Sequence, residues 1–270
     1  MTAVCLTIAG FDNGGGAGIQ ADLKTFAATK SYGLSVLTAL PVQNTLGVGT
    51  IYDMSAQCVK EQLETVFADV MPQAIKIGML ANAAIIDTVA TFLGKHAANI
   101  PIILDPVMIA KSGDYLLAPE ALDAFKEQLL PLADLITPNL PEAQSLVGKR
   151  LSFADMAEYI KKLGPKAVLL KGGHDADKQY ANDLFVSDTN IQWLKAPRIQ
   201  TRNNHGTGCT LSAAITSFIA QGDSLFSACC KAKEYLYQAL LGAVDDSVGQ
   251  GHGPVKHFYF IDQGAYLCGE

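Results

Sequence analysis

The sequence predicts an α/β protein with a central, mostly parallel sheet, helices on both faces and a small antiparallel hairpin at one edge. Short β-branched runs alternate with longer helical stretches through most of the chain, which is the pattern of βαβ units. Of the 270 residues, 49% are hydrophobic and 17% are charged, which provides enough apolar side chain for a large core. No linker, low-complexity tract or repeat interrupts the pattern, so we expect one domain spanning residues 1–270.

Six short runs are rich in apolar and β-branched residues and are therefore expected to form strands, at 4–9, 34–40, 74–78, 101–107, 134–139 and 167–173. Helices are expected between most of them, at 19–29, 56–70, 83–95 and 119–130, and again at about 209–221 and 224–244. The pattern changes after Lys171. There YANDLFV (180–186) and IQWLKAP (191–197) flank the turn residues SDTN, which predicts the antiparallel hairpin at the sheet edge.

The charge balance and the hydropathy pattern narrow the class of protein. The formal net charge is −6, so neither nucleic acid nor an anionic membrane is an expected partner. No N-terminal targeting signal is visible, because VCLTIAG (4–10) is too short and lacks a cationic start. The uncharged run 31–52 is long enough to cross a bilayer, but it contains Pro41, Gln43 and Asn44 and is not expected to do so.

The six cysteines indicate a reduced environment. None lies in a C-x-x-C pair, so a zinc site is not expected. An even number would allow disulfides, but no secretory feature accompanies it. We therefore expect a cytoplasmic protein with free thiols.

Glycine-rich or polar turns follow all six expected strands. In an open parallel sheet, ligands bind beyond the carboxyl ends of the strands, so these turns should meet at one site. Any one of them could be an ordinary turn, but six at one edge favour a binding site. They are AGFDNGGGAG (9–18), QNT (43–45), GML (78–80), DPVM (105–108), TPN (137–139) and KGGH (171–174).

The sequence HGTGC at 205–209 predicts an anion-binding turn. An apolar stripe from Leu211 to Ile219 places the start of a helix close to Gly208 and Cys209. The first N–H groups of a helix have no intrahelical acceptor and carry partial positive charge, so they suit a phosphoryl group. No G-x-x-x-x-G-K-[ST] motif is present, and GGGAG (14–18) lacks the last glycine of the dinucleotide fingerprint. A P-loop NTPase and a typical Rossmann dehydrogenase are therefore not expected.

These motifs together resemble the ribokinase-like superfamily, in the branch of hydroxymethylpyrimidine (HMP) kinases and pyridoxal kinases. The resemblance covers essentially the whole chain and follows the order of the HMP and phospho-HMP kinases of thiamine biosynthesis. It implies a ribokinase-like fold, a small-molecule pyrimidine substrate and a homodimer. The motifs that carry it are IAGFDNGGGAGIQADLKTF, QNTLGV, KIGML, DPVMIAKSGDYLL, TPNLPEA, LLKGGH, NNHGTGCTLSAAI and GQGHGPVKHF.

The resemblance implies that the anion turn is catalytic. Gly206, Thr207 and Gly208 would stabilise the transferred phosphoryl group, and Cys209 replaces the aspartate base that most of the superfamily has at this place. A helix N-terminus lowers a thiol pKa from about 8.5, so Cys209 is expected to exist partly as thiolate. Two alternatives stay open: Cys209 orients the hydroxymethyl group, or it only fills space.

The resemblance also implies ATP and Mg²⁺ as cofactors. Asn139 and Glu142 match an Asn-x-x-Glu element that is associated with metal and phosphate binding, although such a pair more often begins a helix. Asp105, at a strand end, is a further candidate for metal or phosphate, with helix capping as its alternative. Lys171 is expected to reach the ATP phosphates, and Thr207 offers a hydroxyl and an N–H. The adenine pocket is expected to be apolar and formed by the last two helices.

The acceptor pocket should present a flat apolar slot and a few directed hydrogen bonds. Gln43 both donates and accepts, which matches an aminopyrimidine edge, and in the family this glutamine contacts HMP. Met79 would cover a ring face, Gly10 would offer backbone, Asp22 a carboxylate and Val107 a wall. Each of these residues could instead be purely structural.

Three departures from the family pattern affect the shape of the acceptor pocket. Phe11-Asp12-Asn13 stands where Ser-Asp-Ser is common, Pro41-Val42 replaces a smaller pair, and Asn204 replaces threonine. AKSGD (110–114) is a candidate flap. Pyridoxal kinase is the alternative activity, and a non-catalytic nucleotide or pyrimidine sensor is the alternative class. Gln43 favours the pyrimidine, and the retained phosphate-binding residues favour an enzyme.

Overall fold

The computed structural model describes residues 2–108, 117–118, 121–174 and 177–261. Within them, eight strands form one sheet in the order β10-β9-β8-β7-β6-β5-β1-β2. The parallel part consists of β1 (Ala3–Ala9), β2 (Ser31–Leu37), β5 (Ala74–Ile77), β6 (Ile102–Leu104), β7 (Leu135–Ile136) and β8 (Ala167–Leu170). The hairpin β9 (Asp183–Ser187) and β10 (Ile191–Leu194) adds two antiparallel strands at one edge. The predicted fold class and edge hairpin are confirmed.

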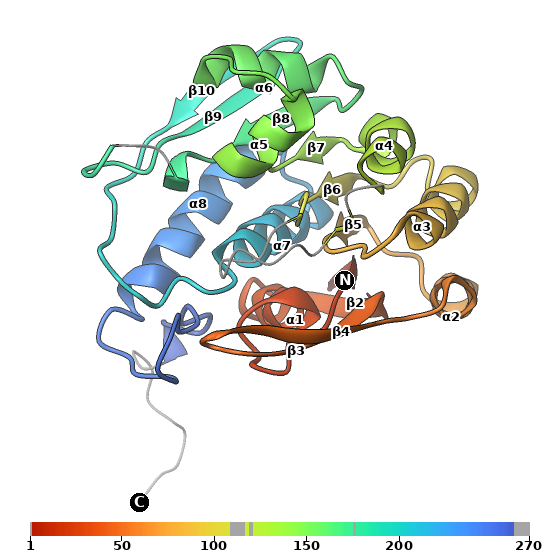
Figure 1. Cartoon of the computed structure of the whole chain (residues 1–270), viewed down its shortest axis with the longest axis horizontal. Coiled ribbons are helices and arrows are strands. Elements are labelled where there is room, and N and C mark those ends of the chain that lie inside the picture. Colours follow the sequence, from red (N-terminus) through yellow and green to blue (C-terminus); the bar gives the residue numbers. More distant parts are fainter. Residues whose placement is uncertain (1, 109–116, 119–120, 175–176, 262–270) are drawn as a thin grey trace, which may run out of the picture.

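Helices cover both faces of the sheet (Figure 1). One face packs against α1 (Gly18–Ala28), α7 (Thr207–Ala220) and α8 (Leu225–Leu241). The other packs against α2 (Ala56–Asp69), α3 (Ala83–His96), α4 (Leu122–Ala124), α5 (Leu140–Val147) and α6 (Phe153–Lys161), with α4 continued by helical turns to Leu132.

The strands are buried on both faces, which explains their nearly continuous apolar sequences. Ile103, Leu135 and Leu169 belong to the core beneath α7 and α8. Their neighbours Leu104 and Ile136 belong to the core on the opposite face. This alternation fixes the register of the strands. Because they pair in parallel, their carboxyl ends lie at the same end of the sheet.

The run predicted as a strand at 34–40 is divided between two sheets. Strand β2 ends at Leu37, and β3 (Ala39–Asn44) then pairs with β4 (Gly47–Asp53) as a separate antiparallel hairpin. Its register shifts between Pro41 and Gln43, since a proline has no N–H for a regular ladder. Figure 1 shows this hairpin in orange beside β2 and α1.

Helices α5 and α6 were also not predicted, because both are short and lie close together in the sequence. The candidate flap at 110–114 and the first residues of the helix expected at 119–130 lie outside the described residues. In the described part of the chain, no helix combines the length and apolar character that a bilayer-spanning segment requires. Cys5, Cys58, Cys209, Cys229 and Cys230 carry free thiols, and Cys268 is not described.

Candidate functional site

One cavity of about 690 Å³ lies at the carboxyl ends of the parallel strands. The loops after the parallel strands β1, β5, β6, β7 and β8 all contribute to its wall, as expected for an open α/β sheet. Of the thirteen residues predicted for the site, twelve line it: Gly10, Gln43, Met79, Asp105, Val107, Asn139, Glu142, Lys171, Gly206, Thr207, Gly208 and Cys209. Asp22 is the exception.

The anion turn has the predicted geometry. Gly206 is the N-cap of α7 with a φ of +75°, and no side chain caps the helix there. A Cβ at this position would overlap the carbonyl oxygen of Gly16, so both the dihedral angle and the packing require glycine. The free N–H groups of the first turn therefore face the cavity without a bulky side chain beside them.

The loop after β1 is held against the anion turn by Asp12. Its carboxylate accepts backbone N–H bonds from Gly14, Gly16 and Ala17 and lies 2.8 Å from the Nε2 of His205. Burial opposes ionisation, but His205 and the N–H donors outweigh it and hold the pKa of Asp12 at about 2. The glycine-rich turn was predicted to reach the site, but no role was predicted for Asp12. An Asp-Asn pair before a run of glycines is the signal for such a loop.

The expected low pKa of Cys209 is contradicted. The side chain is half-buried, and loss of solvation raises the pKa of its thiol to about 11. The ammonium of Lys76 opposes this shift, while the carboxylates of Asp22 and Asp105 reinforce it. Burial near carboxylates thus outweighs the favourable helix terminus, and the thiol is protonated near neutral pH.

Asp105 joins four elements at the centre of the site. Its Oδ1 accepts hydrogen bonds from Lys171 Nζ and Thr137 Oγ1, both at 3.1 Å, and its Oδ2 accepts one from Ser212 Oγ at 3.2 Å. Burial alone would raise the pKa of Asp105, but the ammonium groups of Lys171 and Lys76 lower it. Asp105 is therefore a buried, charged link between strand ends and α7 rather than a helix cap.

Asn139 and Glu142 form a capping box at the start of α5. Asn139 Oδ1 accepts from the N–H of Glu142 at 2.9 Å, and Glu142 Oε2 accepts from the N–H of Asn139 at 2.7 Å. The structural alternative for this pair is thus present, yet both residues also line the cavity. Burial and the charge of Asp105 raise the pKa of Glu142 to about 7, although Lys171 opposes the shift.

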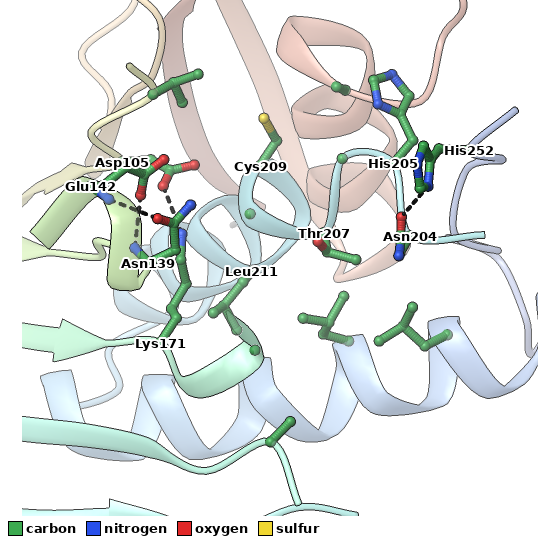
Figure 2. Close-up of a pocket in the computed structure, with 18 of the residues that line it drawn as sticks. Asp105, Asn139, Glu142, Lys171, Asn204, His205, Thr207, Cys209, Leu211 and His252 are labelled. Carbon is green, nitrogen blue, oxygen red and sulfur yellow. Dashed lines mark hydrogen bonds and ion pairs between the residues drawn. The ribbon is translucent and has the colours of Figure 1, made fainter. Parts of the chain in front are cut away.

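Different polar side chains lie on the two sides of the N-terminus of α7 (Figure 2). Asp105, Asn139, Glu142 and Lys171 gather on one side. His205 and Asn204 lie on the other, where Asn204 Oδ1 is 3.1 Å from His252 Nδ1. Polar groups from distant parts of the chain therefore surround the helix terminus.

Four of the predicted acceptor residues, all except Asp22, line the part of the cavity next to the β3–β4 hairpin. Gln43 is held by its backbone N–H, which donates to Asn13 Oδ1 at 2.9 Å. Met79 is nearly buried, and a Cβ on Gly10 would lie 3.0 Å from its sulfur. Val107 packs against the same small apolar cluster as Met79.

Asp22 does not face this pocket. Its side chain is completely buried in α1 and accepts hydrogen bonds from Lys76 Nζ and Thr7 Oγ1. The prediction that Asp22 presents its carboxylate to the acceptor is therefore wrong. Asp22 instead holds Lys76 from outside the cavity. Lys76, which the sequence analysis did not select, lines the cavity instead.

The opposite end of the cavity is largely apolar. As expected, α8 contributes to it, through Leu236, Tyr237 and Leu240, and α7 contributes Leu211. The segment after β10 also lines this end, from Ala196 to Ile199, and was missed because it has no motif. The position of this segment depends only on how β9 and β10 pair at the edge of the sheet.

Comparisons with known proteins agree on one family. A family model described as phosphomethylpyrimidine kinase matches residues 12–256. The chain is 50% identical over 268 residues to the hydroxymethylpyrimidine/phosphomethylpyrimidine kinase of Rhizobium meliloti (strain 1021), covering 96% of this chain and 98% of that protein.

Two solved structures are similar throughout. The phosphomethylpyrimidine kinase from Clostridium difficile 630 has 43% identity and a TM-score of 0.77, over 88% of this chain and 99% of that one. An ADP complex of Bacillus subtilis pyridoxal kinase has 34% identity and a TM-score of 0.88, over 97% and 99% of the two chains. The chain thus belongs to the phosphomethylpyrimidine kinase family.

Proposed function

We propose that this chain is a single-domain, ATP-dependent kinase that phosphorylates HMP and then HMP phosphate in thiamine biosynthesis. The observation that carries the proposal is that three kinds of group line one cavity. They are Gln43 and Met79, the glycine-rich terminus of α7, and the apolar side chains of α8. An acceptor, a transferred phosphoryl group and an adenine ring suit these three regions respectively. ATP-coupled assays with purified HMP, HMP phosphate and pyridoxal test it.

The chain's own groups account for the transfer. The backbone N–H groups of Thr207, Gly208 and Cys209 bind the phosphoryl oxygens, and Lys171, whose ammonium is close to Gly208, adds positive charge. Cys209 holds the acceptor hydroxyl in line with the γ-phosphate. Its thiol is protonated at rest, so only the minor thiolate form can accept the hydroxyl proton, and it becomes a thiol again as the bond to phosphorus forms.

The donor set fits Mg²⁺. Asp105 and Glu142 both interact with the ammonium of Lys171, which places two carboxyl groups beside the anion turn. In the described residues, no group of three or more His, Cys, Asp or Glu side chains could enclose a metal. A hard cation that retains water and binds phosphate oxygens needs only such partial protein ligation. Glu142, Asp105 and Asn139 would hold the ion, which would neutralise phosphate charge.

The variant Gln43→Met should weaken HMP binding by about 1–3 kcal/mol, because the aminopyrimidine edge would lose a buried hydrogen-bonding partner. Any pyridoxal turnover should decrease less. Steady-state kinetics with both acceptors measures the difference. Equal losses for the two acceptors would show that Gln43 does not read the pyrimidine edge.

Pyridoxal phosphorylation is the second candidate activity. The similar fold of the B. subtilis pyridoxal kinase favours it, since that structure matches nearly the whole chain. A non-catalytic sensor is disfavoured because Lys171, Asp105 and the anion turn remain assembled around one cavity. Relative kcat/KM values for HMP and pyridoxal decide between the two activities.

We also propose that the active form is a homodimer. Tyr32 on β2 and Val42, Leu46 and Tyr52 on the β3–β4 hairpin are exposed apolar side chains on neighbouring elements. A second copy would cover this surface. Sedimentation equilibrium should give twice the chain mass, and Leu46→Lys with Tyr52→Lys should shift it toward the monomer. A monomeric wild type would refute the proposal.

A further inference from the structure

Lys76 is a buried ammonium at the floor of the active-site cavity. Its side chain has no solvent exposure, and its Nζ donates to both carboxylate oxygens of Asp22, at 2.9 and 2.8 Å. Asp22 also accepts from Thr7 Oγ1 at 2.6 Å. A buried ion pair contributes little net stability compared with well-packed apolar residues of similar size. Stability alone therefore does not explain charge at this place.

The pair has a fixed orientation. Lys76 comes from β5, Asp22 from α1 and Thr7 from β1, so three elements hold it. Gly78 leaves room for the ammonium, since a Cβ there would lie 2.9 Å from Lys76 Nζ. Lys76 lines the cavity whereas Asp22 does not. Lys76 is therefore the member of the pair that borders the cavity, although neither side chain is exposed to solvent.

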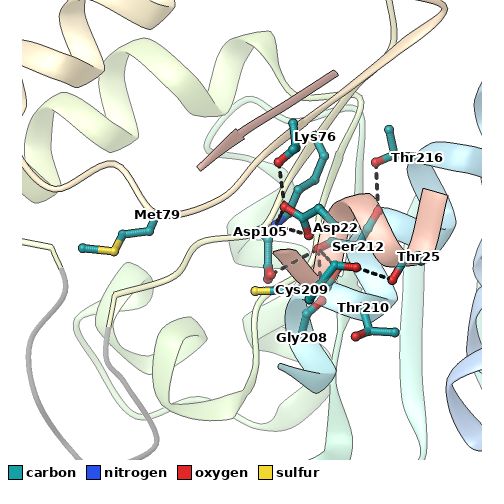
Figure 3. A network of polar contacts seen from close by, with 12 residues as sticks. Asp22, Thr25, Lys76, Met79, Asp105, Gly208, Cys209, Thr210, Ser212 and Thr216 are labelled. Atoms are coloured by element: carbon teal, nitrogen blue, oxygen red, sulfur yellow. Dashed lines mark hydrogen bonds and ion pairs between the residues drawn. The ribbon is translucent and has the colours of Figure 1, made fainter. Parts of the chain in front are cut away.

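Cys209 and Lys76 belong to one polar cluster (Figure 3). The figure shows Lys76, Asp22, Asp105 and Cys209 gathered at the start of α7. The charged groups that act on Cys209 come from four elements: Lys76 on β5, Asp22 on α1, Asp105 after β6 and Lys171 after β8. Among these groups, Lys76 has the largest effect on the thiol.

We propose that Lys76 is a positioning residue for phosphoryl transfer, whose ammonium, aimed by Asp22, supplies fixed positive potential at the Cys209 sulfur and the neighbouring acceptor oxygen. Lys76 forms no bond to substrate and exchanges no proton in this role. Its charge stabilises negative charge that develops on the acceptor side during transfer. The inference rests on the proposed position of the acceptor beside Cys209.

The test compares two variants that break the same ion pair but differ in whether the ammonium of Lys76 is kept. Lys76→Met combined with Asp22→Asn leaves a neutral pair of similar shape, and Asp22→Asn alone leaves the ammonium unneutralised. Cys209 is alkylated at fixed pH with anionic iodoacetate or with neutral iodoacetamide, and its peptide is quantified by mass spectrometry. Both reagents attack the same thiolate, so the ratio of their rates reports the local potential.

The double variant should lower the iodoacetate-to-iodoacetamide ratio by about threefold to tenfold, and Asp22→Asn should raise it by a similar factor. The kcat for HMP should decrease in the double variant while the KM for ATP changes by less than about twofold. Thr7→Val is the control, because it removes a hydrogen bond to Asp22 without changing charge. It should leave the ratio unchanged.

A purely structural role predicts a different result. General loosening would change the rates of both reagents alike and leave the ratio constant in every variant, which would overturn the proposal. An altered ratio with an unchanged HMP turnover would also overturn it. A wild-type protein that does not phosphorylate HMP would refute the proposed function separately, because the alkylation ratio needs no substrate.

Discussion

Cys209→Ala should lower kcat for HMP by roughly 100-fold or more, while the affinity for ATP changes by less than about threefold. The thiol lies at the start of α7 and lines the cavity beside the anion turn. Alanine retains the turn and its N–H groups but removes the proposed partner of the acceptor hydroxyl. Steady-state kinetics with HMP and calorimetric titration with a non-hydrolysable ATP analogue separate the two effects.

The same variant should harm phosphorylation of HMP phosphate less. That acceptor is already ionised near neutral pH, so it does not need a group to take its proton. With a thiol pKa near 11, the thiolate population rises as the pH increases from 7 toward 10. The wild-type HMP rate should therefore increase over this range, and the rate with HMP phosphate should not.

Cys209→Ser provides the matched control, because a hydroxyl retains the hydrogen bond but is a far weaker acid. It should recover positioning without the pH dependence. If Cys209→Ala reduced the rates with both acceptors by one factor, proton removal would not be its role and positioning would remain. Near-wild-type turnover would mean that the backbone N–H groups alone support the transfer.

The sequence was sufficient to predict which loops meet. Gly10, Asn139 and Lys171 are far apart in the chain, yet each follows a run that reads as a buried strand. Parallel strands bring their carboxyl ends to one edge, so the motifs converge without any knowledge of side-chain packing. The anion turn was predicted for a similar reason, because a glycine pair before an apolar helical stripe marks a helix start.

What the sequence could not provide depends on burial by distant residues. The helix terminus predicted a low pKa for Cys209, but burial of the thiol and the charges of Asp22 and Asp105 raise its pKa instead. The position of Asp22 within a predicted helix does not reveal whether its carboxylate faces the pocket or, as observed, Lys76. Lys76 itself interrupts an apolar strand, and a charged residue at such a position is the signal that was overlooked.

Lys171→Ala should lower kcat/KM for HMP phosphate by roughly 100-fold to 1,000-fold, and at least as much as for HMP. The ammonium lies 3.1 Å from Asp105 Oδ1 and close to the anion turn, since a Cβ on Gly208 would be 3.4 Å from it. The second reaction brings an anionic acceptor beside the γ-phosphate. Loss of the Lys171 charge therefore increases the repulsion between HMP phosphate and the γ-phosphate, and it also weakens binding of the transferred phosphoryl group.

The loss must be separated from damage to the fold, because removing Lys171 leaves Asp105 buried without its cation. Lys171→Arg keeps the charge and should recover much of the rate with HMP phosphate, and thermal unfolding shows whether each variant remains folded. Lys231→Ala removes an ammonium from an exposed ion pair with Asp223 and should change neither reaction. Initial rates on the two purified acceptors at saturating Mg-ATP give the comparison. A greater loss of rate with HMP than with HMP phosphate would contradict the prediction. It would mean that Lys171 interacts with the nucleotide only and does not offset the charge of the anionic acceptor.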